Sequence, residues 1–308
     1  PTRSRRAPSG RYGRAVSSVI VGGSANVDQV FRLERIPSPG ETVLSTGFST
    51  ARGGKGQNQA VAAARAGAPT AFIAALGDDA FGSDTRAGLI DDGVDVTGVR
   101  SLDAATGTAL IAVDSVGENT IIVEAGANRL LVDLQSADAA AIAASSVLAM
   151  QLEIPLETVI AAARIARAAD TTVMLNAAPI RDLPAELLSS LDILVVNEHE
   201  ASHLAGERDW RELTEQVPVV VVTLGSEGAL LLRRGSDEVR VAAPSVHAVD
   251  ATGAGDTFCG AFAAGLAEDM ELEQALRFAV TAASLSVQSY GAVPSIPLRA
   301  QIDAATAR

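Results

Sequence analysis

Residues 250–256 read Asp-Ala-Thr-Gly-Ala-Gly-Asp and lead directly into a helix-like run over residues 257–267. The glycine-rich turn can direct several backbone N–H groups at one point, and a helix that starts there adds the positive end of its dipole. Such an arrangement suits a phosphate. A carboxylate at Asp256 is unfavourable beside a phosphate unless it accepts the proton of a nucleophile that attacks phosphorus. Taken alone, the stretch is equally compatible with an ordinary capped helix N-terminus.

A second glycine-rich stretch, residues 52–58, reads Arg-Gly-Gly-Lys-Gly-Gln-Asn and contains the only lysine of the sequence, Lys55. Chance could place a single lysine anywhere, but here the flanking glycines let the backbone and a compact ammonium approach a ligand together. The stretch is not a Walker A loop, because Gly56 stands where that motif needs Ser or Thr. The chain therefore offers one glycine-rich loop with a cation and another with a carboxylate, which suits phosphoryl transfer between two small molecules.

Short β-rich runs alternate with longer helical patterns along the chain. Buried strands are predicted over residues 16–21, 70–76, 147–152, 172–175, 193–196 and 219–224. Helices are predicted over residues 56–66, 81–91, 156–169, 198–204, 254–267 and 272–288. This alternation predicts an α/β fold with a doubly wound, mainly parallel central sheet and helices on both faces. Such sheets bind ligands beyond the carboxyl ends of their strands.

Two inserts, at about residues 26–52 and 106–123, break this alternation with hairpin-like patterns. We expect them to form a small β-sheet lid over the ligand site, within a single α/β domain covering residues 16–308. Residues 1–15 are rich in arginine and are expected to be a disordered tail. Pairing between two lids would cover exposed strand edges and predicts a homodimer.

The formal net charge of the chain is −13. The first fifteen residues hold five arginines and no acid, so the remainder carries a net charge of −18. This charge argues against binding of nucleic acid or an anionic membrane. The lone Cys259 excludes an intramolecular disulfide and any metal site with several cysteines. No apolar run approaches the roughly 20 residues that span a bilayer, and we expect a cytoplasmic protein.

Asn197 and Glu200 stand one turn apart where a predicted strand ends and a helix begins. Their oxygens suit hydrated Mg²⁺, and a helix capping box is the alternative. The same helix matches the H-E-x-x-H zinc pattern at residues 199–203. Because no third protein ligand follows, we favour two surface histidines over a zinc protease.

Polar residues also follow other predicted strands. Asn26 and Asp28 lie just past the first strand, and Glu153 ends another. The side chains of Asn26 and Asp28 suit hydrogen bonds to sugar hydroxyls, with ordinary turn chemistry as the alternative, and Glu153 is expected at the same rim of the sheet. Residues 223–228 form a strand-to-turn segment whose amides could face a nucleotide.

Together these segments resemble the ribokinase (PfkB) family of carbohydrate and nucleoside kinases. The resemblance runs from about residue 19 to 297, and its most specific parts are residues 53–60 and 250–256. The Asn197/Glu200 pair and residues 223–226 fall in the expected order between them. Within the family, the branch that phosphorylates ribose is the most similar, on the motifs at residues 39–42, 124–128 and 150–153.

The resemblance implies that D-ribose is phosphorylated at its 5-hydroxyl with ATP, and it assigns roles to matching positions. The catalytic set is Asp256 as general base, with Gly253, Ala254 and Gly255 as the anion hole. The sugar contacts are Asn26, Asp28, Gly54, Lys55, Gly56, Asn58, Glu153 and Asp256. The ATP contacts are Asn197, Thr223, Gly225, Ser226, Gly228 and Gly255. The K⁺ positions are Asp250, Thr252, Ser286, Ser289, Gly291 and Ser295. Glu200 matches the position that holds Mg²⁺ through water.

One position departs from the family pattern, because Val280 stands where a polar residue near adenine is expected. Alternative functions keep the fold but change the acceptor to a nucleoside, 2-deoxyribose or another sugar. Aromatic residues make up only 3% of the chain, and the lid offers mainly Phe31 and Phe48 to face a nucleobase, which favours a free sugar. A sugar-binding regulator without catalysis is a third alternative, and the retention of Asp256 and its glycine turn argues against it.

Overall fold

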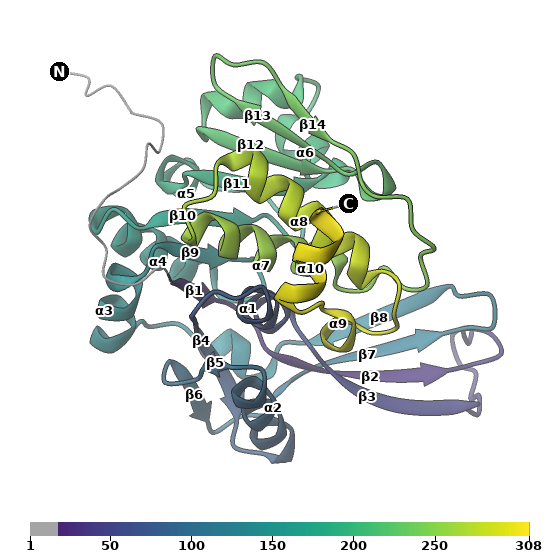
Figure 1. Cartoon of the computed structure of the whole chain (residues 1–308). Coiled ribbons are helices and arrows are strands. Elements are labelled where there is room, and N and C mark those ends of the chain that lie inside the picture. The colour runs from purple at the N-terminus through teal and green to yellow at the C-terminus, as the bar shows by residue number, and fades with distance from the viewer. Residues whose placement is uncertain (1–17, 308) are drawn as a thin grey trace.

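A large mixed sheet forms the centre of the computed structural model, which describes residues 18–307 (Figure 1). Its strand order is β14-β13-β12-β11-β10-β9-β1-β4-β5, with β6 paired to β4. The strands are β1 Val19–Gly22, β4 Thr70–Gly77, β5 Val94–Asp95, β6 Val99–Leu102, β9 Val147–Met150, β10 Thr172–Asn176, β11 Ile193–Asn197, β12 Val219–Thr223, β13 Ala229–Arg233 and β14 Val239–Val241. All pairings are parallel except those of β12 with β13 and β13 with β14.

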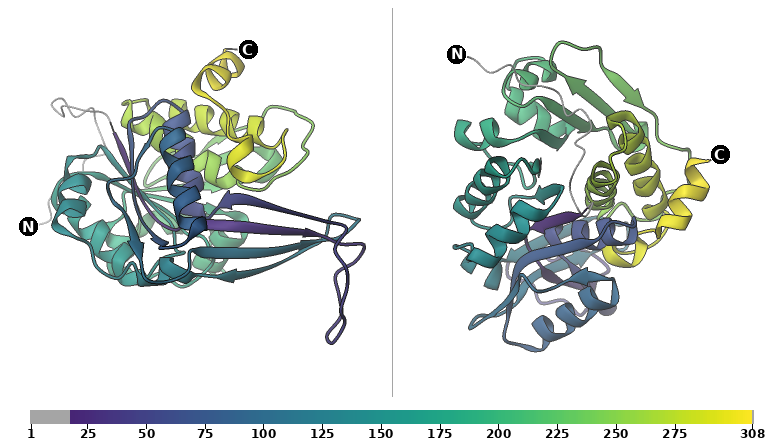
Figure 2. Two further views of the ribbon diagram at one scale, coloured as in Figure 1. Left: turned by 90° about the horizontal axis from the view of Figure 1, so that it is seen from below. Right: turned by 60° about the vertical axis from the view of Figure 1, so that its left-hand side comes forward.

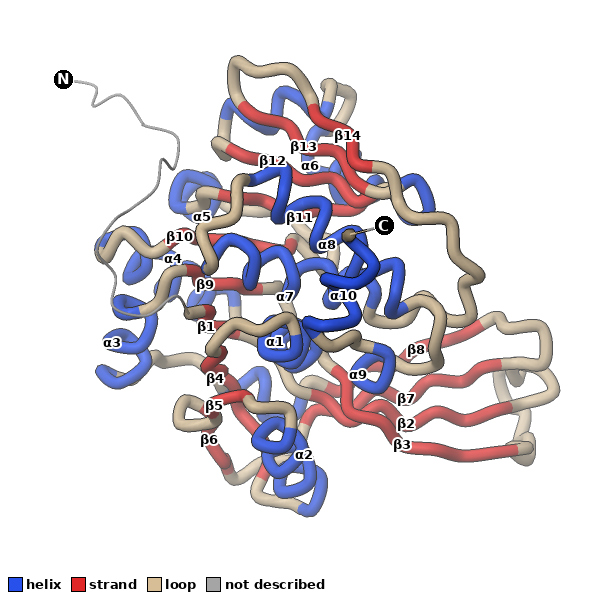
Figure 3. The backbone as a smooth tube through the Cα atoms, viewed as in Figure 1, coloured by secondary structure: helices blue, strands red, loops and turns tan. Residues whose placement is uncertain are grey.

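Both faces of this sheet are apolar, because its strands are runs of β-branched and aliphatic residues. Side chains alternate between the two faces: Val19 and Val21 pack with one core, and Ile20 packs with the other. The helices fall into two layers accordingly (Figure 3). One core includes residues of α1 Lys55–Arg65, α2 Ala80–Asp91, α7 Ala254–Ala267, α8 Leu272–Ser286, α9 Ala292–Ser295 and α10 Arg299–Thr306. The other includes residues of η1 Gly126–Leu130, α3 Ser136–Ala144, α4 Leu156–Ala168, α5 Ala185–Ser190, α6 Glu198–Ala205 and η2 Trp210–Glu215.

A smaller sheet is built from the two inserts, and we call it the lid sheet. Its order is β3-β2-β7-β8, with β2 Asn26–Arg32, β3 Gly47–Gly53, β7 Gly107–Val113 and β8 Asn119–Glu124. β2 and β7 pair in parallel, so the two inserts meet at the centre of this sheet. The lid sheet projects from one side of the α/β body (Figure 2). The predicted fold class, with helices on both faces of a mainly parallel sheet and a small β-sheet lid, is thereby confirmed.

Several boundaries differ from the sequence-based expectations. β13 and β14 were not predicted, and they extend the sheet with antiparallel strands beyond β12. β9 ends at Met150 rather than at residue 152, and Gln151 and Glu153, which follow it, make polar contacts described below. The predicted tail at residues 1–15, and the start of the first strand at residues 16 and 17, lie outside the described residues. Among the described helices, none is long and apolar enough to cross a membrane.

Candidate active site

The two glycine-rich stretches each open a helix, α1 and α7, and these helices pack against each other. Their close approach depends on Gly260 of α7, since a Cβ there would lie 2.5 Å from the Ala62 Cβ of α1. Gly253 precedes α7 with φ of 74°, a left-handed conformation, and a Cβ on it would lie 2.8 Å from the Ala292 Cβ. Together these contacts place Asp256 beside the first two turns of α1.

Asp256 is 7% exposed, and two amides of α1 hold its carboxylate. Asn58 Nδ2 donates to Asp256 Oδ2 at 2.9 Å, and Gln59 Nε2 donates to Oδ1 at 3.0 Å. Burial raises the pKa of Asp256, while Lys55, Asn58 and Gln59 offset part of that rise. A carboxylate with a raised pKa, placed at a helix N-terminus, is suited to accept a proton.

The turn before α7 supplies backbone donors next to this carboxylate. In an α-helix, the N–H groups of the first turn have no intrahelical partner. The Ala254 N–H donates to Ala251 O at 3.1 Å, and the Thr257 N–H begins the helical bonds with Gly253 O at 2.8 Å. The helix therefore leaves the N–H groups of Gly255 and Asp256 without intrahelical acceptors. Of the three predicted anion-hole amides, that of Ala254 is the one engaged within the turn.

A cavity of about 240 Å³ lies at this point. It brings together predicted residues from all parts of the chain, namely Lys55, Asn197, Glu200, Thr223, Gly253, Gly255 and Asp256. Burial alone would lower the pKa of Lys55, but the carboxylates of Asp256, Glu153 and Glu200 outweigh it and raise the pKa. The only lysine therefore remains a cation, surrounded by acids.

The root of the lid sheet adjoins this lysine. Glu153 Oε2 accepts from Ser24 Oγ at 2.5 Å and from the Lys55 N–H at 3.0 Å. Burial raises the pKa of Asp28 to about 6, and the nearby charges of Glu153 and Asp256 add to the rise. The predicted sugar-binding carboxylates thus lie close enough to each other and to Asp256 for their charges to interact.

Asn26 is held by a residue that sequence reasoning left without a role. Asn128 Nδ2 donates to Asn26 Oδ1 at 2.7 Å, and Asn128 Oδ1 accepts from the Ala25 N–H at 2.9 Å. Because the oxygen of the Asn26 amide is occupied, its NH₂ group is the part left to meet a ligand. In the sequence, only its position in the motif at residues 124–128 pointed to a role for Asn128.

The capping-box alternative at the start of α6 is observed. Asn197 Oδ1 accepts from the Glu200 N–H, and Glu200 Oε2 accepts from the Asn197 N–H, both at 2.8 Å. Glu200 also lines the cavity, and burial raises its pKa against the opposing effects of Asn197, Lys55 and His199. The cap orients both side chains at the end of β11, so the two interpretations of this pair are compatible.

Thr223 lines the same cavity at the end of β12, and a short helix, η3 Gly225–Glu227, follows it. Gly225 and Ser226 are exposed on the outer side of this turn. The Gly228 N–H donates to Gly225 O at 3.1 Å, so its amide is used within the turn. Val280 is 4% exposed and packs in the apolar core.

The predicted K⁺ positions lie in the loop before α7 and in the segment from the end of α8 to α9, and Asp250 joins these two segments. Asp250 Oδ1 accepts from the Thr252 N–H at 2.9 Å, and Oδ2 accepts from the Gly291 N–H at 2.8 Å. Burial alone would raise the pKa of Asp250, but these donors outweigh it and lower the pKa. The hydroxyls of Ser286 and Ser295 donate to carbonyls of their own helices, and the Ser289 N–H donates to Ser286 O. The ionised carboxylate, hydroxyl and carbonyl oxygens form a donor set that fits a hard cation.

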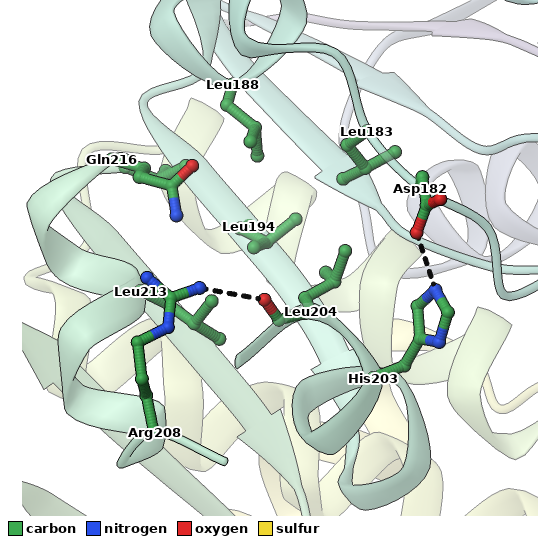
Figure 4. A pocket seen from close by; sticks show the side chains of 10 residues that line it. Asp182, Leu183, Leu188, Leu194, His203, Leu204, Arg208, Leu213 and Gln216 are labelled. Atoms are coloured by element: carbon green, nitrogen blue, oxygen red, sulfur yellow. Dashed lines mark hydrogen bonds and ion pairs between the residues drawn. The ribbon is translucent and has the colours of Figure 1, made fainter. Parts of the chain in front are cut away.

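The H-E-x-x-H match does not gather its histidines at one point of the cavity. His203 Nε2 lies 3.0 Å from Asp182 Oδ1, at the edge of a separate hollow of about 260 Å³ behind α6 (Figure 4). His199 is exposed on the first turn of the same helix. Among residues 18–307, no group of three or more His, Cys, Asp or Glu side chains is arranged to hold a metal ion.

The chain belongs to the pfkB family of carbohydrate kinases, whose model matches residues 16–299. Its relatives include proteins known as ribokinase. That of Schizosaccharomyces pombe is 39% identical over 307 residues, covering 93% of this chain and 96% of the relative. That of Haemophilus influenzae is 39% identical over 294 residues, covering 92% and 96%. The solved structure of Arabidopsis thaliana ribokinase, complexed with ribose and ATP, superposes with a TM-score of 0.88 at 36% identity and covers 94% of this chain and 98% of that one.

Proposed function

We propose that this chain is an ATP-dependent kinase that phosphorylates D-ribose at its 5-hydroxyl. The observation that carries the proposal is the buried Asp256, fixed beside a glycine turn with free N–H groups and next to the only lysine. Identities of 36–39% to ribokinases, over nearly the whole of each chain, support ribose as the acceptor.

In the proposed reaction, Asp256 accepts the proton of the 5-hydroxyl as the sugar oxygen attacks the γ-phosphorus of ATP. The bond from the γ-phosphorus to the bridging oxygen breaks, and ADP leaves. Its two amide partners hold the carboxylate in place and still leave lone pairs on each oxygen for the hydroxyl. The N–H groups of Gly255 and Asp256, at the positive end of α7, stabilise negative charge on the transferred phosphoryl group. The anion hole is therefore proposed at residues 253–256, with the Ala254 amide contributing only if its turn bond to Ala251 opens.

The sugar is proposed to lie between the root of the lid sheet and α1. Asn26 presents an NH₂ donor, and Asp28 and Glu153 present carboxylate acceptors. Lys55 supplies a cation whose charge balances these acids and Asp256. Gly54, Gly56 and Asn58 complete the sugar-binding set. Closure of the lid sheet over this site would keep water from accepting the phosphoryl group.

The nucleotide is proposed to lie along the ends of β11 and β12, against Asn197, Thr223, Gly225 and Ser226. Gly228 is assigned to shaping this turn. Mg²⁺, when bound, would neutralise charge on the phosphates. Glu200 would hold its water shell, since it faces the same cavity. K⁺ would be held by the loop before α7 and by the segment from the end of α8 to α9, which Asp250 joins. Because ATP is the donor, we place the reaction in the cytoplasm.

A panel of pentoses, hexoses and nucleosides with ATP tests this function directly. We expect the highest kcat/KM with D-ribose, and a product that carries phosphate on carbon 5. Repeating the panel with Na⁺ and then with K⁺ tests the cation site. Preference for a nucleoside would replace ribose as the acceptor, and absence of any acceptor-dependent ADP formation would favour a sugar-binding regulator.

We further propose that the chain forms a homodimer through the lid sheet. All residues of β8 are exposed, including Ile121, Ile122 and Val123 at 53%, 62% and 56%. An exposed apolar edge strand favours pairing with a second copy. Sedimentation at micromolar concentration should show a dimer that Ile122→Lys weakens. Val116→Lys, on the turn of the same hairpin, is the matched control. A wild-type monomer would contradict the proposal.

A further inference from the structure

Gln59 contacts the carboxylate of Asp256 but belongs to none of the site residues predicted from the sequence. Its Nε2 donates to Asp256 Oδ1 at 3.0 Å, and it also lies 3.3 Å from Asn176 Oδ1 at the end of β10. The side chain is fully buried, with 0% exposure. It therefore reaches the carboxylate from the protein interior rather than from the ligand cavity.

A second buried amide fixes the orientation of Gln59. Gln151, which follows β9 and is also 0% exposed, donates from Nε2 to Gln59 Oε1 at 2.6 Å. Rotating the Gln59 amide by half a turn would set its oxygen against the Asp256 carboxylate and its NH₂ against the NH₂ of Gln151. Both contacts would be repulsive, so only one orientation of Gln59 satisfies its neighbours.

Asn58, the other amide on Asp256, differs in its relation to the proposed ligand. Asn58 belongs to the proposed sugar-binding set, and its Oδ1 has no partner among the described residues, so a sugar can engage this side chain. Gln59 has no access to the cavity and keeps its bond to Asp256 throughout. The two oxygens of the base are thus held by one partner that a ligand can contact and one that it cannot.

We propose that Gln59 is a positioning residue that holds the Asp256 carboxylate in its reactive orientation, and that Gln151 acts by orienting Gln59. The proposal rests on the assignment of Asp256 as the base in the proposed function. A fixed N–H donor on Oδ1 restricts rotation of the carboxylate and favours its ionised form. The charged or titratable groups around Asp256 are Lys55 from α1, Asp28 from β2, Glu153 after β9, and Cys259 one turn further along α7.

The test is the pH dependence of kcat/KM in Gln59→Met, measured with the acceptor that the wild type uses best. The variant keeps the length and burial of the side chain but loses the donor. We expect kcat to fall roughly ten- to hundredfold, the range for a lost hydrogen bond to a charged group. The acid limb of the profile should move to higher pH, and the KM for the sugar should change less than threefold.

Gln57→Met is the matched control, because Gln57 lies on the same helix with 0% exposure and neither polar side-chain atom has a partner among the described residues. Its acid limb and kcat should match those of the wild type. An unshifted acid limb in Gln59→Met, or equal effects of the two variants, would overturn the proposal. A wild type without kinase activity would instead contradict the proposed function and, with it, this inference.

Gln151→Met provides a second test that leaves the contact between Gln59 and Asp256 in place. We expect the acid limb to shift in the same direction by a smaller amount. The double variant Gln59→Met/Gln151→Met should be no more impaired in kcat than Gln59→Met alone, since Gln151 acts through Gln59. Additive losses in kcat would show that Gln151 acts independently of Gln59. They would overturn the proposal that Gln151 acts by orienting Gln59. If Gln59→Met does not fold, the shift in Gln151→Met decides the proposal.

Discussion

The two carboxylates that bracket residues 250–256 have opposite environments. Asp256 is buried, receives its hydrogen bonds from side chains of α1, and has a raised pKa. Asp250 is partly exposed, receives its hydrogen bonds from backbone amides of two loops, and has a lowered pKa. Two aspartates only six residues apart therefore have different surroundings and opposite pKa shifts. Burial favours the protonated form of Asp256, which suits the proposed base, whereas the amides around Asp250 favour its ionised form.

The largest effect is expected for Asp256→Asn, which tests whether the buried aspartate acts as the base. The amide cannot accept the proton of the sugar hydroxyl, so we expect kcat to fall by roughly 10²–10⁴, the range for general-base catalysis. The protein should still fold, because removing a buried charge offsets the contact that the new NH₂ group makes with one of the two amide donors. Steady-state kinetics and thermal melts check both expectations. Turnover close to that of the wild type would remove Asp256 from the role of base.

Lys55→Arg is expected to have the next largest effect. Arginine keeps the positive charge, but its planar fork does not fit where a compact ammonium lies among Asp256, Glu153 and Glu200. We expect kcat/KM for ribose to fall by roughly tenfold or more, as for a lost charged hydrogen bond. Arg164→Lys makes the reverse exchange at an exposed position of α4, away from the cavity, and serves as a control for protein quality. Unchanged kinetics in Lys55→Arg would show that the position of the only lysine has no functional significance.

Asp250→Asn addresses the other end of the loop. It keeps one acceptor oxygen but replaces the other with an NH₂ group that cannot accept from the Thr252 or Gly291 N–H. We expect kcat to fall roughly three- to tenfold, which corresponds to about 0.7–1.4 kcal/mol for one weakened hydrogen bond. Any activation by K⁺ should also weaken. Activation by K⁺ equal to that of the wild type would separate Asp250 from the cation site.

The smallest expected effect is on sugar binding at low pH. The pKa of Asp28 is raised to about 6, so Asp28 is ionised above that pH and protonated below it. Protonation removes one acceptor for sugar hydroxyls, and the KM for ribose should rise a few-fold as pH falls through about 6. Asp28→Asn should abolish this change in KM, although the acid limb of kcat due to Asp256 persists. A KM that is flat across this range in the wild type would contradict the prediction.

Much of the fold followed from periodicity, because strands such as β12, with Val at residues 219–222, can only be buried on both faces. β13 was missed for a physical reason. Its sequence, Ala-Leu-Leu-Leu-Arg, has no β-branched residue, and its strand conformation comes from pairing with β12. Local propensity does not contain that tertiary contribution.

Site residues could be predicted where a sequence motif contained them. They could not be predicted where their role depends on contacts between residues far apart in the sequence. Asp256 and Lys55 stand in glycine-rich stretches that are visible in the sequence. Gln59 contacts a residue 197 positions away, and Gln151 contacts one 92 positions away. Both lie in the quoted motifs, but only the packing of α1 against α7 and against the segment after β9 shows that their amides meet. The capping box at residues 197–200 was foreseeable because it is local.

The single lysine makes the site chemically addressable. Apart from the chain terminus, an amine-acylating reagent has only the Lys55 ammonium as a target in this sequence. Its raised pKa keeps the amine protonated and slow to react. A sugar seated on it should slow the reaction further. The terminal amine has a lower pKa and adds the first mass increment. A second increment on the intact protein would therefore report, without peptide mapping, what fraction of molecules have Lys55 free of a sugar.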